Sequence, residues 1–357
     1  TLNDDQAVKA LKAWGFKNVS ATDATWSACY TEIRRANILL EKINDVPDLQ
    51  LPEKEANKKH WIGLARLYRG WQHYCLVRKF GDVQWLDHTL TADSTEALMA
   101  ARDSRNYVMD KVLEDLNFAC QYLPKGTKTS WSKDMANAMK ADICLWEGTF
   151  CKYRTAAENG KAADTSRAQK FLNECVTACE NVMNAGYKLG DDYQATYNSV
   201  SLSSNPEVIF FKEYKDNLFY HSLIAYTCSS TQISGMTKDA FDAYLFKGGK
   251  PLALTSENKS DVGEEDADGN YSIAKLLEVR DARLAKTIDP FVYYEGMGWT
   301  RAGAMDMTSS TGYGVCKYDN VALPRDNRAN TVKNYTSAPL FWLAVVYCNF
   351  AEAKAEL

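Results

Sequence analysis

The sequence predicts a mainly α-helical protein with a loop-rich region, containing short β-strands, inserted between its helical parts. Three observations lead to this prediction. In residues 1–186, apolar side chains recur at three- and four-residue steps, which is the period of an amphipathic helix. Between residues 187 and 337, that period gives way to short β-prone runs separated by Gly, Ser and Asn. The helical period returns in residues 338–357, so we treat the chain as one integrated domain.

The first predicted helix covers residues 24–45, and the second begins near Pro52 and ends at Gly81. Proline suits the first turn of a helix because its missing N–H has no intrahelical partner there, and glycine is common just beyond the last turn. Apolar and aromatic residues form a stripe on each helix: Trp26, Cys29, Tyr30, Ile33, Leu40 and Ile43 on the first, and Leu64, Leu67, Tyr68, Trp71, Tyr74 and Cys75 on the second. Each stripe is expected to pack against a neighbouring helix.

Three more helices are predicted in the first part of the chain. They run from about Ser104 to Tyr122, from a capping residue at Ser132 onward, and from Thr165 to Gly186. Helices of roughly 20 residues joined by loops each leave an apolar face uncovered. Antiparallel helix pairs that stack into a solenoid would cover those faces.

The inserted region begins with two β-prone runs, Glu207–Phe211 and Leu223–Cys228, and contains a Gly/Ser/Thr-rich loop at residues 303–314. Long loops in an ordered domain are usually functional, so this region is predicted to carry function. A last helix is predicted to begin at Pro339. It shows no stop signal at Leu357, so we expect the natural protein to continue.

Composition and motifs favour a binding protein over an enzyme. The 357-residue chain has 42 Lys and Arg against 46 Asp and Glu, a formal net charge of −4, which gives no electrostatic reason to expect nucleic acid or an anionic membrane surface. Its ten cysteines and four histidines form no C-x-x-C motif and no ligand cluster, so we predict no metal and no cofactor. Nucleophile-elbow, phosphate-loop and dinucleotide motifs are also absent, so no catalytic residue is predicted.

One acidic stretch partly matches a calcium loop. Glu264, Asp266 and Asp268 occupy the first, third and fifth positions, but Lys275 stands where the bidentate glutamate belongs. Replacing that ligand by a cation removes the strongest contact. A solvated acidic loop is therefore the favoured interpretation, and a bound calcium ion is the alternative.

Aromatic residues in loops are the better indication of function. Trp85 directly follows the second helix, and Tyr293, Tyr294 and Trp299 share a glycine-containing loop. Sugar rings present apolar C–H faces that stack on Trp and Tyr, while polar side chains bind the hydroxyl groups. The predicted hydrogen-bonding partners of the sugar are Gln84, Arg301 and Asp306. The alternative is that each ring fills a small satellite core.

Several ordered motifs resemble the SusD/RagB family of outer-membrane nutrient-binding proteins. The stretch Tyr30–Ile43 contains the I-x-x-A-N core of the family's early helix, and Gly63–Val83 contains an R-x-x-R helix that ends in F-G-D-V. Gln84 stands where the family has proline. Weaker matches follow in family order: Asn205–Ile209, Arg280–Arg283, Cys316–Asp319 and the A-E-A helix within Pro339–Leu357.

The resemblance implies tetratricopeptide-like helical pairs with a loop-rich ligand-binding part, and a protein that does no chemistry. It implies a lipid-anchored protein on the extracellular face of the outer membrane, bound to the membrane only through an anchor that this chain lacks. Its partners would be an oligosaccharide or polysaccharide and a SusC-like TonB-dependent transporter. Ligand sites in the family tend to use the loop after the F-G-D-V helix and loops of the inserted region, where Trp85 and Trp299 lie.

Two other functions remain open from the sequence. A helical-repeat scaffold could bind only a protein partner, as helical solenoids commonly do. A helical glycan-cleaving enzyme would need a pair of carboxylates at a set separation, and the sequence defines no such pair.

Overall fold

The chain forms two compact units. The structure, a computed structural model, describes residues 6–8, 22–154, 162–223, 234–256, 270–288, 291–293, 299–301, 307–309, 311, 313–324, 327 and 333–357. The helical unit consists of Asn18–Leu189, Pro206–Phe211 and Leu340–Leu357, and the mixed unit consists of Thr1–Lys17, Gly190–Asn205 and Lys212–Pro339.

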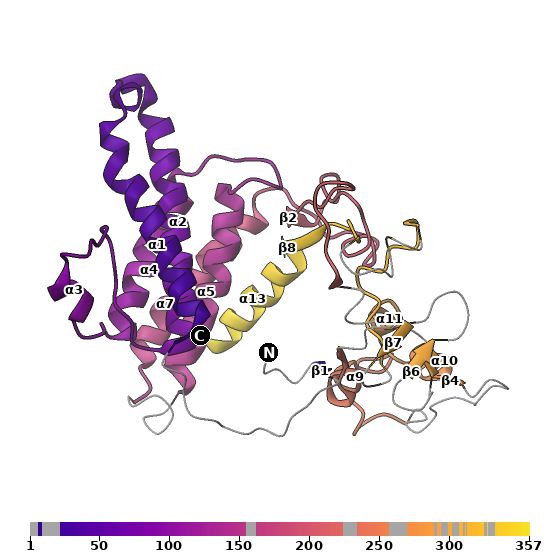
Figure 1. Cartoon of the computed structure of the whole chain (residues 1–357). Helices are drawn as coiled ribbons and strands as arrows, with labels where there is room; N and C mark the ends of the chain where they lie inside the picture. The colour runs from indigo at the N-terminus through magenta and orange to yellow at the C-terminus, as the bar shows by residue number, and fades with distance from the viewer. Residues whose placement is uncertain are drawn as a thin grey trace. The chain divides into compact units, whose positions relative to one another are not determined.

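Long helices that pair along the described chain build the helical unit (Figure 1). They are α1 (Ala24–Lys42), α2 (Glu55–Phe80), α4 (Arg105–Tyr122), α5 (Lys133–Tyr153), α7 (Thr165–Met183) and α13 (Leu343–Glu356). α1 packs on α2, α2 on α4, α4 on α5, and α5 on α7, while α13 packs on α7. The prediction of a mainly helical chain is therefore confirmed.

Short elements connect the first of these helices. Three 3-10 turns, Ile43–Asp45, Pro47–Gln50 and Pro52–Lys54, join α1 to α2, and the five-residue helix α3 (Thr95–Met99) interrupts the connection from α2 to α4. The predicted boundary near Pro52 therefore marks a 3-10 turn that leads directly into α2.

The helices meet through the apolar stripes that the sequence displays. Ile33, Leu67, Val112, Leu116 and Ile143 are almost inaccessible to solvent and belong to one continuous core of the helical unit. Burying an aliphatic side chain of this size stabilises a fold by about 1.5–3 kcal/mol. Tertiary packing of these stripes, more than local helix propensity, holds the unit together.

Capping residues fix where the helices begin and end. The carboxylate of Asp23 accepts hydrogen bonds from the N–H groups of Thr25 (2.8 Å) and Trp26 (3.4 Å) at the start of α1. Ser132 caps α5 in the same way, as predicted. α2 ends at Gly81, whose φ of 73° is a conformation that costs little only for glycine.

One predicted boundary is wrong. The period predicts a helix from Pro339, but Ala338–Trp342 forms strand β8, which pairs with β2 (Val208–Lys212). The helix begins at Leu343, whose N–H donates to the carbonyl of Glu207 at 2.9 Å. Pairing with a strand that is distant in the sequence satisfies the backbone groups, so a tertiary contact outweighs the local pattern.

The mixed unit contains antiparallel two-stranded sheets and short helices. The strand pairs are β1 (Gln6–Val8) with β3 (Ser234–Met236), β4 (Asn270–Ser272) with β5 (Phe291–Tyr293), and β6 (Trp299–Arg301) with β7 (Met307–Ser309). The helices are α9 (Lys238–Ala243), α10 (Ala274–Val279) and α11 (Ala282–Ala285). Phe241, Leu284 and Ile288 belong to a small separate core. Most of the predicted run Leu223–Cys228 lies outside the described residues.

Candidate functional site

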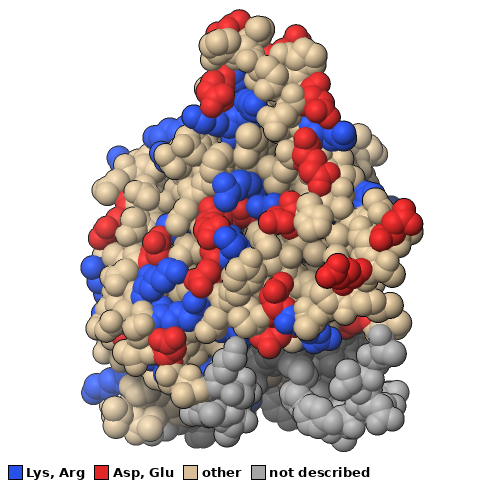
Figure 2. Space-filling view, turned by 90° about the vertical axis from the view of Figure 1, so that its left-hand side faces the viewer, with Lys and Arg blue, Asp and Glu red and all other residues tan. Residues whose placement is uncertain are grey.

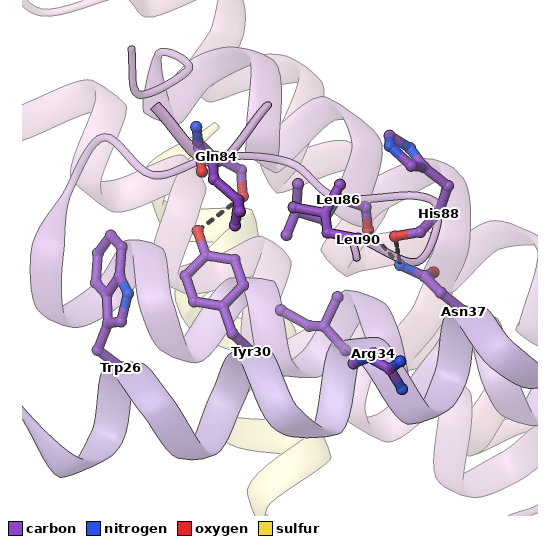
Figure 3. Close-up of a pocket in the computed structure, with 10 residues that line it drawn as sticks. Trp26, Tyr30, Arg34, Asn37, Gln84, Leu86, His88 and Leu90 are labelled. Carbon is purple, nitrogen blue, oxygen red and sulfur yellow. Dashed lines mark hydrogen bonds between the residues drawn. The ribbon is translucent and has the colours of Figure 1, made fainter. Parts of the chain in front are cut away.

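A cavity of about 420 Å³ lies between α1 and the α2–α4 connection, residues 81–104 (Figure 3). We call it the α1 cavity. Its lining residues on α1 are Trp26, Tyr30, Ile33, Arg34 and Asn37. Its lining residues on the connection are Gln84, Leu86, His88, Leu90 and Leu98. Aromatic and aliphatic side chains thus share the wall with a few polar groups.

Helical spacing places the polar and aromatic groups of α1 together. Trp26, Tyr30 and Asn37 lie about one or two turns apart and project from one side of α1 towards the connection (Figure 3). The rings of Trp26 and Tyr30 lie 5.1 Å apart between centroids, with their planes tilted by 56°. The two rings therefore offer differently angled apolar surfaces on one wall.

Hydrogen bonds from α1 hold the opposite wall. The Asn37 amide donates to the carbonyls of Leu86 and His88, at 3.0 Å in each case, and the Tyr30 hydroxyl donates to the Gln84 carbonyl at 2.9 Å. Burial raises the pKa of Tyr30 to about 12, so its hydroxyl keeps its proton at neutral pH. These contacts fix the width of the cavity because they join both walls directly.

A buried histidine on α2 forms a hydrogen bond with the connection. His73 on α2 is fully buried, and its Nε2 accepts a hydrogen bond from the Leu86 N–H at 3.2 Å. Its Nδ1 lies 3.0 Å from the carbonyl of Arg69, which assigns the proton to Nδ1. Burial lowers the pKa of His73 to about 3, so the ring is neutral and can play both roles. His73 is thus a packing residue of the second helix.

The structure places the two predicted residues of this loop differently. Gln84 lines the α1 cavity, and its amide donates to the carbonyls of Ala97 and Ala100, at 2.9 Å each. Trp85 is half-buried and is not a lining residue of the cavity. Its ring centroid lies 4.1 Å from that of His73. A direct sugar contact by Trp85 stays a prediction.

The other predicted site residues belong to the mixed unit. Tyr293 lies in β5, and Trp299 and Arg301 lie in β6, where the structure describes the backbone alone. Tyr294 and Asp306 lie outside the described residues. Their roles in binding stay predictions.

The calcium-like stretch with Asp266 and Asp268 also lies outside the described residues. Within the part of the chain that is described, no group of three or more His, Cys, Asp or Glu side chains could hold a metal ion. None of the described helices combines the length and the apolar character needed to cross a lipid bilayer.

Of the ten lining residues, sequence reasoning predicted Gln84 alone, and the nine that it missed include Trp26, Tyr30 and Arg34. The two aromatic residues belong to the apolar stripe of α1, and partial packing on the core accounts for their place in that stripe. An ordinary helical stripe consists mainly of aliphatic residues, whereas this one has two large aromatic rings one turn apart, with an arginine nearby. That unusual composition could have identified these residues from the sequence.

A second hollow, which we call the α1–α2 groove, lies on another side of α1. Its volume is about 560 Å³. Trp61 and Trp131 line it together with Tyr68, whose hydroxyl donates to Glu32 at 3.0 Å. Arg35 also lines the groove and pairs with Glu32. The surface that its lining exposes is almost entirely apolar, so it offers a ligand less polar surface than the α1 cavity does.

Comparisons with known proteins agree on one family. Residues 2–145 match the family SusD-like_3, described as "Starch-binding associating with outer membrane". The curated SusD-like protein P2 of Formosa agariphila is 23% identical over 355 aligned residues, covering 94% of this chain and 62% of that protein. A SusD-like carbohydrate-binding protein of Bacteroides fragilis has a TM-score of 0.73 at 19% identity, covering 99% of this chain and 66% of that one.

A laminarin-binding SusD-like protein of known structure shares the fold as well. Its TM-score is 0.55 at 21% identity, and the match covers 93% of this chain and 67% of that one. The chain spans less than two thirds of the length of the Formosa and Bacteroides relatives.

Proposed function

Because the chain belongs to the SusD-like family, we propose that it binds oligosaccharides without cleaving them and passes them to a SusC-like TonB-dependent transporter. The observation that carries the binding proposal is the α1 cavity, where two aromatic rings face polar groups across a space of about 420 Å³. A cavity of this size falls within the usual range for small-molecule sites.

The chemistry of the cavity suits a sugar ring. Trp26 and Tyr30 provide faces for the C–H groups of the ring, and the Arg34 guanidinium and the free oxygen of the Gln84 amide supply a donor and an acceptor for its hydroxyls. Leu90 and Leu98 add apolar surface to the lining. All of these residues lie on α1 or on the connection that follows α2.

The predicted residues of the mixed unit form a separate part of the proposal. Tyr293, Tyr294 and Trp299 are proposed to stack on a sugar, with Arg301 and Asp306 as hydrogen-bonding partners. Trp85 and Gln84 are the proposed contacts on the helical unit. The family resemblance supports this set, as does the place of Gln84 and Trp85 in the connection that follows α2.

Cell-surface location and delivery are further parts of the proposal. The description of the matched family associates it with the outer membrane, which supports a lipid-anchored position on the extracellular face. Delivery to a SusC-like partner follows from the family resemblance. Co-purification of the full-length protein with a TonB-dependent transporter would test this part separately.

Isothermal titration calorimetry against a panel of plant, algal and host oligosaccharides tests the binding proposal. We expect at least one ligand to bind, and Trp26→Ala to weaken its binding about tenfold, or about 1.4 kcal/mol. Trp61→Ala is the matched control, because Trp61 is an exposed tryptophan of the same unit that lines the α1–α2 groove.

The control decides between the two hollows. If Trp61→Ala abolished binding while Trp26→Ala left it unchanged, the site would be the α1–α2 groove. A panel with no ligand, together with a retained transporter complex, would instead favour the protein scaffold. Released reducing sugar would contradict the non-catalytic function.

A further inference from the structure

We infer that the α1 cavity selects an acidic sugar, one that carries a carboxylate or a sulfate group, through the guanidinium groups of Arg34 and Arg102. The inference rests on the proposed function and adds the chemical class of the ligand. It comes from the partners of the charged side chains around the cavity. Within the described part of the chain, no carboxylate forms an ion pair with either of these two arginines.

Arg34 is the charged group that lines the cavity directly. It lies on α1 one turn after Tyr30 and is exposed to solvent (Figure 3). No carboxylate of the described residues forms an ion pair with it, although its neighbour Arg35 is paired with Glu32. An exposed guanidinium keeps its full charge and its five donors for a ligand.

The nearby carboxylates are already engaged by protein groups. Glu41 accepts hydrogen bonds from the N–H (2.6 Å) and the hydroxyl (2.8 Å) of Thr89, and these bonds lower the pKa of Glu41. Asp23 pairs with Lys79 at 2.8 Å, which lowers the pKa of Asp23. Asp103 accepts from a backbone N–H of the connection at 2.8 Å. These carboxylates keep their negative charge, but their hydrogen bonds go to other protein groups, and none of them forms an ion pair with Arg34 or Arg102.

Arg102 adds a second positive charge beside the aromatic wall. Its guanidinium carbon lies 5.1 Å from the ring centre of Trp26, and no carboxylate in the described ranges pairs with it. A cation–π contact holds the group near the ring and leaves its charge uncompensated. Figure 2 shows Lys and Arg interspersed with Asp and Glu on one face of the molecule, so that face is not an extended basic surface.

An acidic sugar can form an ion pair with a guanidinium, and a neutral sugar cannot. The planar fork of a guanidinium matches the oxygens of a carboxylate or a sulfate, and such charge-assisted bonds are about twice as strong as neutral ones. His88 at the rim contacts Asp87 at 3.0 Å, so that carboxylate also has a partner. The aromatic pair Trp26 and Tyr30 would hold the ring face of either kind of sugar.

The test compares each acidic oligosaccharide with its own neutralised form by calorimetry. One arm pairs uronate oligosaccharides with their carboxyl-reduced forms, and the other pairs sulfated oligosaccharides with their desulfated forms. We expect at least one acidic form to bind tenfold or more tightly than its neutral counterpart. The arm in which the preference appears identifies the acid.

Two variants assign the preference to the cavity. Arg34→Gln should remove most of the preference for the acidic form, because its affinity for the acidic form should fall much further than its affinity for the neutral form. Arg34→Lys should retain part of the preference. Arg35→Gln makes the same charge change one residue further along α1, where the side chain lines the α1–α2 groove. The preference should survive in Arg35→Gln.

The outcomes separate this inference from the proposed function. Equal binding of acidic and neutral forms, or a preference that survives in an Arg34→Gln/Arg102→Gln double variant, would overturn the acidic-sugar inference alone. Binding of no glycan in either form would contradict the proposed function as well.

Discussion

The arginines of the helical core and those of the α1 cavity differ in their partners. Arg69 is buried, and its guanidinium donates to Asp115 at 2.8 Å. Arg105 is buried against Glu147, whose side chain has no exposed surface, and Arg167 reaches the same carboxylate at 3.4 Å. Arg34 and Arg102, in contrast, are exposed and have no carboxylate partner among the described residues.

The difference indicates separate roles for the two groups. A charge taken out of water needs a partner of opposite sign, because desolvation costs several kcal/mol per ion. The buried arginines therefore serve the fold. An exposed arginine keeps its water until a ligand replaces it, so the cavity arginines are available for recognition. Variants of the first group should lower stability, and variants of the second should lower affinity.

The largest expected effect is a loss of stability when a buried ion pair of the helical core is broken. Glu147→Gln removes the carboxylate that Arg105 and Arg167 share. Arg167 keeps its ion pair with Asp110 at 2.9 Å, whereas Arg105 is left as a buried charge with no carboxylate partner among the described residues. We expect a loss of about 3–5 kcal/mol in the free energy of unfolding. Urea denaturation measures it. Glu41→Gln, which removes an exposed carboxylate that accepts hydrogen bonds from Thr89, should cost far less. Equal losses of stability in the two variants would contradict the distinction between buried and exposed charged groups.

The next effect is a dependence of stability on pH. His73 takes up a proton near pH 6.5 when unfolded but only near pH 3 when folded, so acid favours the unfolded state. Its contribution is full above about pH 6.5 and falls by up to about 1.4 kcal/mol per pH unit as the pH drops towards 3. Urea titrations at pH 7 and pH 5 measure the slope. A His73→Gln variant with an unchanged slope would contradict this assignment.

A smaller effect is expected where the two walls of the cavity are joined. Tyr30→Phe removes the hydrogen bond to the Gln84 carbonyl and keeps the ring face. We expect a loss of about 0.5–1.5 kcal/mol in stability and weaker glycan binding. Thermal melting and calorimetry measure the two quantities. Tyr107→Phe, at an exposed position on α4, should change neither.

The smallest expected effect on stability concerns Arg34, an exposed arginine of the α1 cavity. Arg34→Gln should change the free energy of unfolding by no more than about 0.5 kcal/mol, because surface substitutions away from special features rarely exceed that. A loss above about 2 kcal/mol, far outside that range, would show that Arg34 supports the fold.

Much of the helical unit could be predicted from the sequence. The apolar period marks α1, α2, α4 and α5. Local signals mark the start of α5 at Ser132 and the end of α2 at Gly81, because capping depends on neighbours in sequence. Strand β8 could not be predicted, because it exists through pairing with β2, which the local period does not encode.

The site was less predictable than the fold. Gln84 is identified by its place after the F-G-D-V motif, and it does line the α1 cavity. Trp26 and Tyr30 resemble core residues, because a helical stripe cannot show which of its rings keeps an open face. The contact of Trp85 with His73 depends on how the connection folds back over α2, and sequence spacing does not determine that.

A crystal structure of the chain with its tightest-binding oligosaccharide tests the central claim most directly. We predict electron density for a sugar between the aromatic wall of Trp26 and Tyr30 and the connection at Gln84, with its acidic group facing Arg34. A sugar bound instead in the α1–α2 groove against Trp61 and Trp131, with the α1 cavity filled by water, would contradict the account.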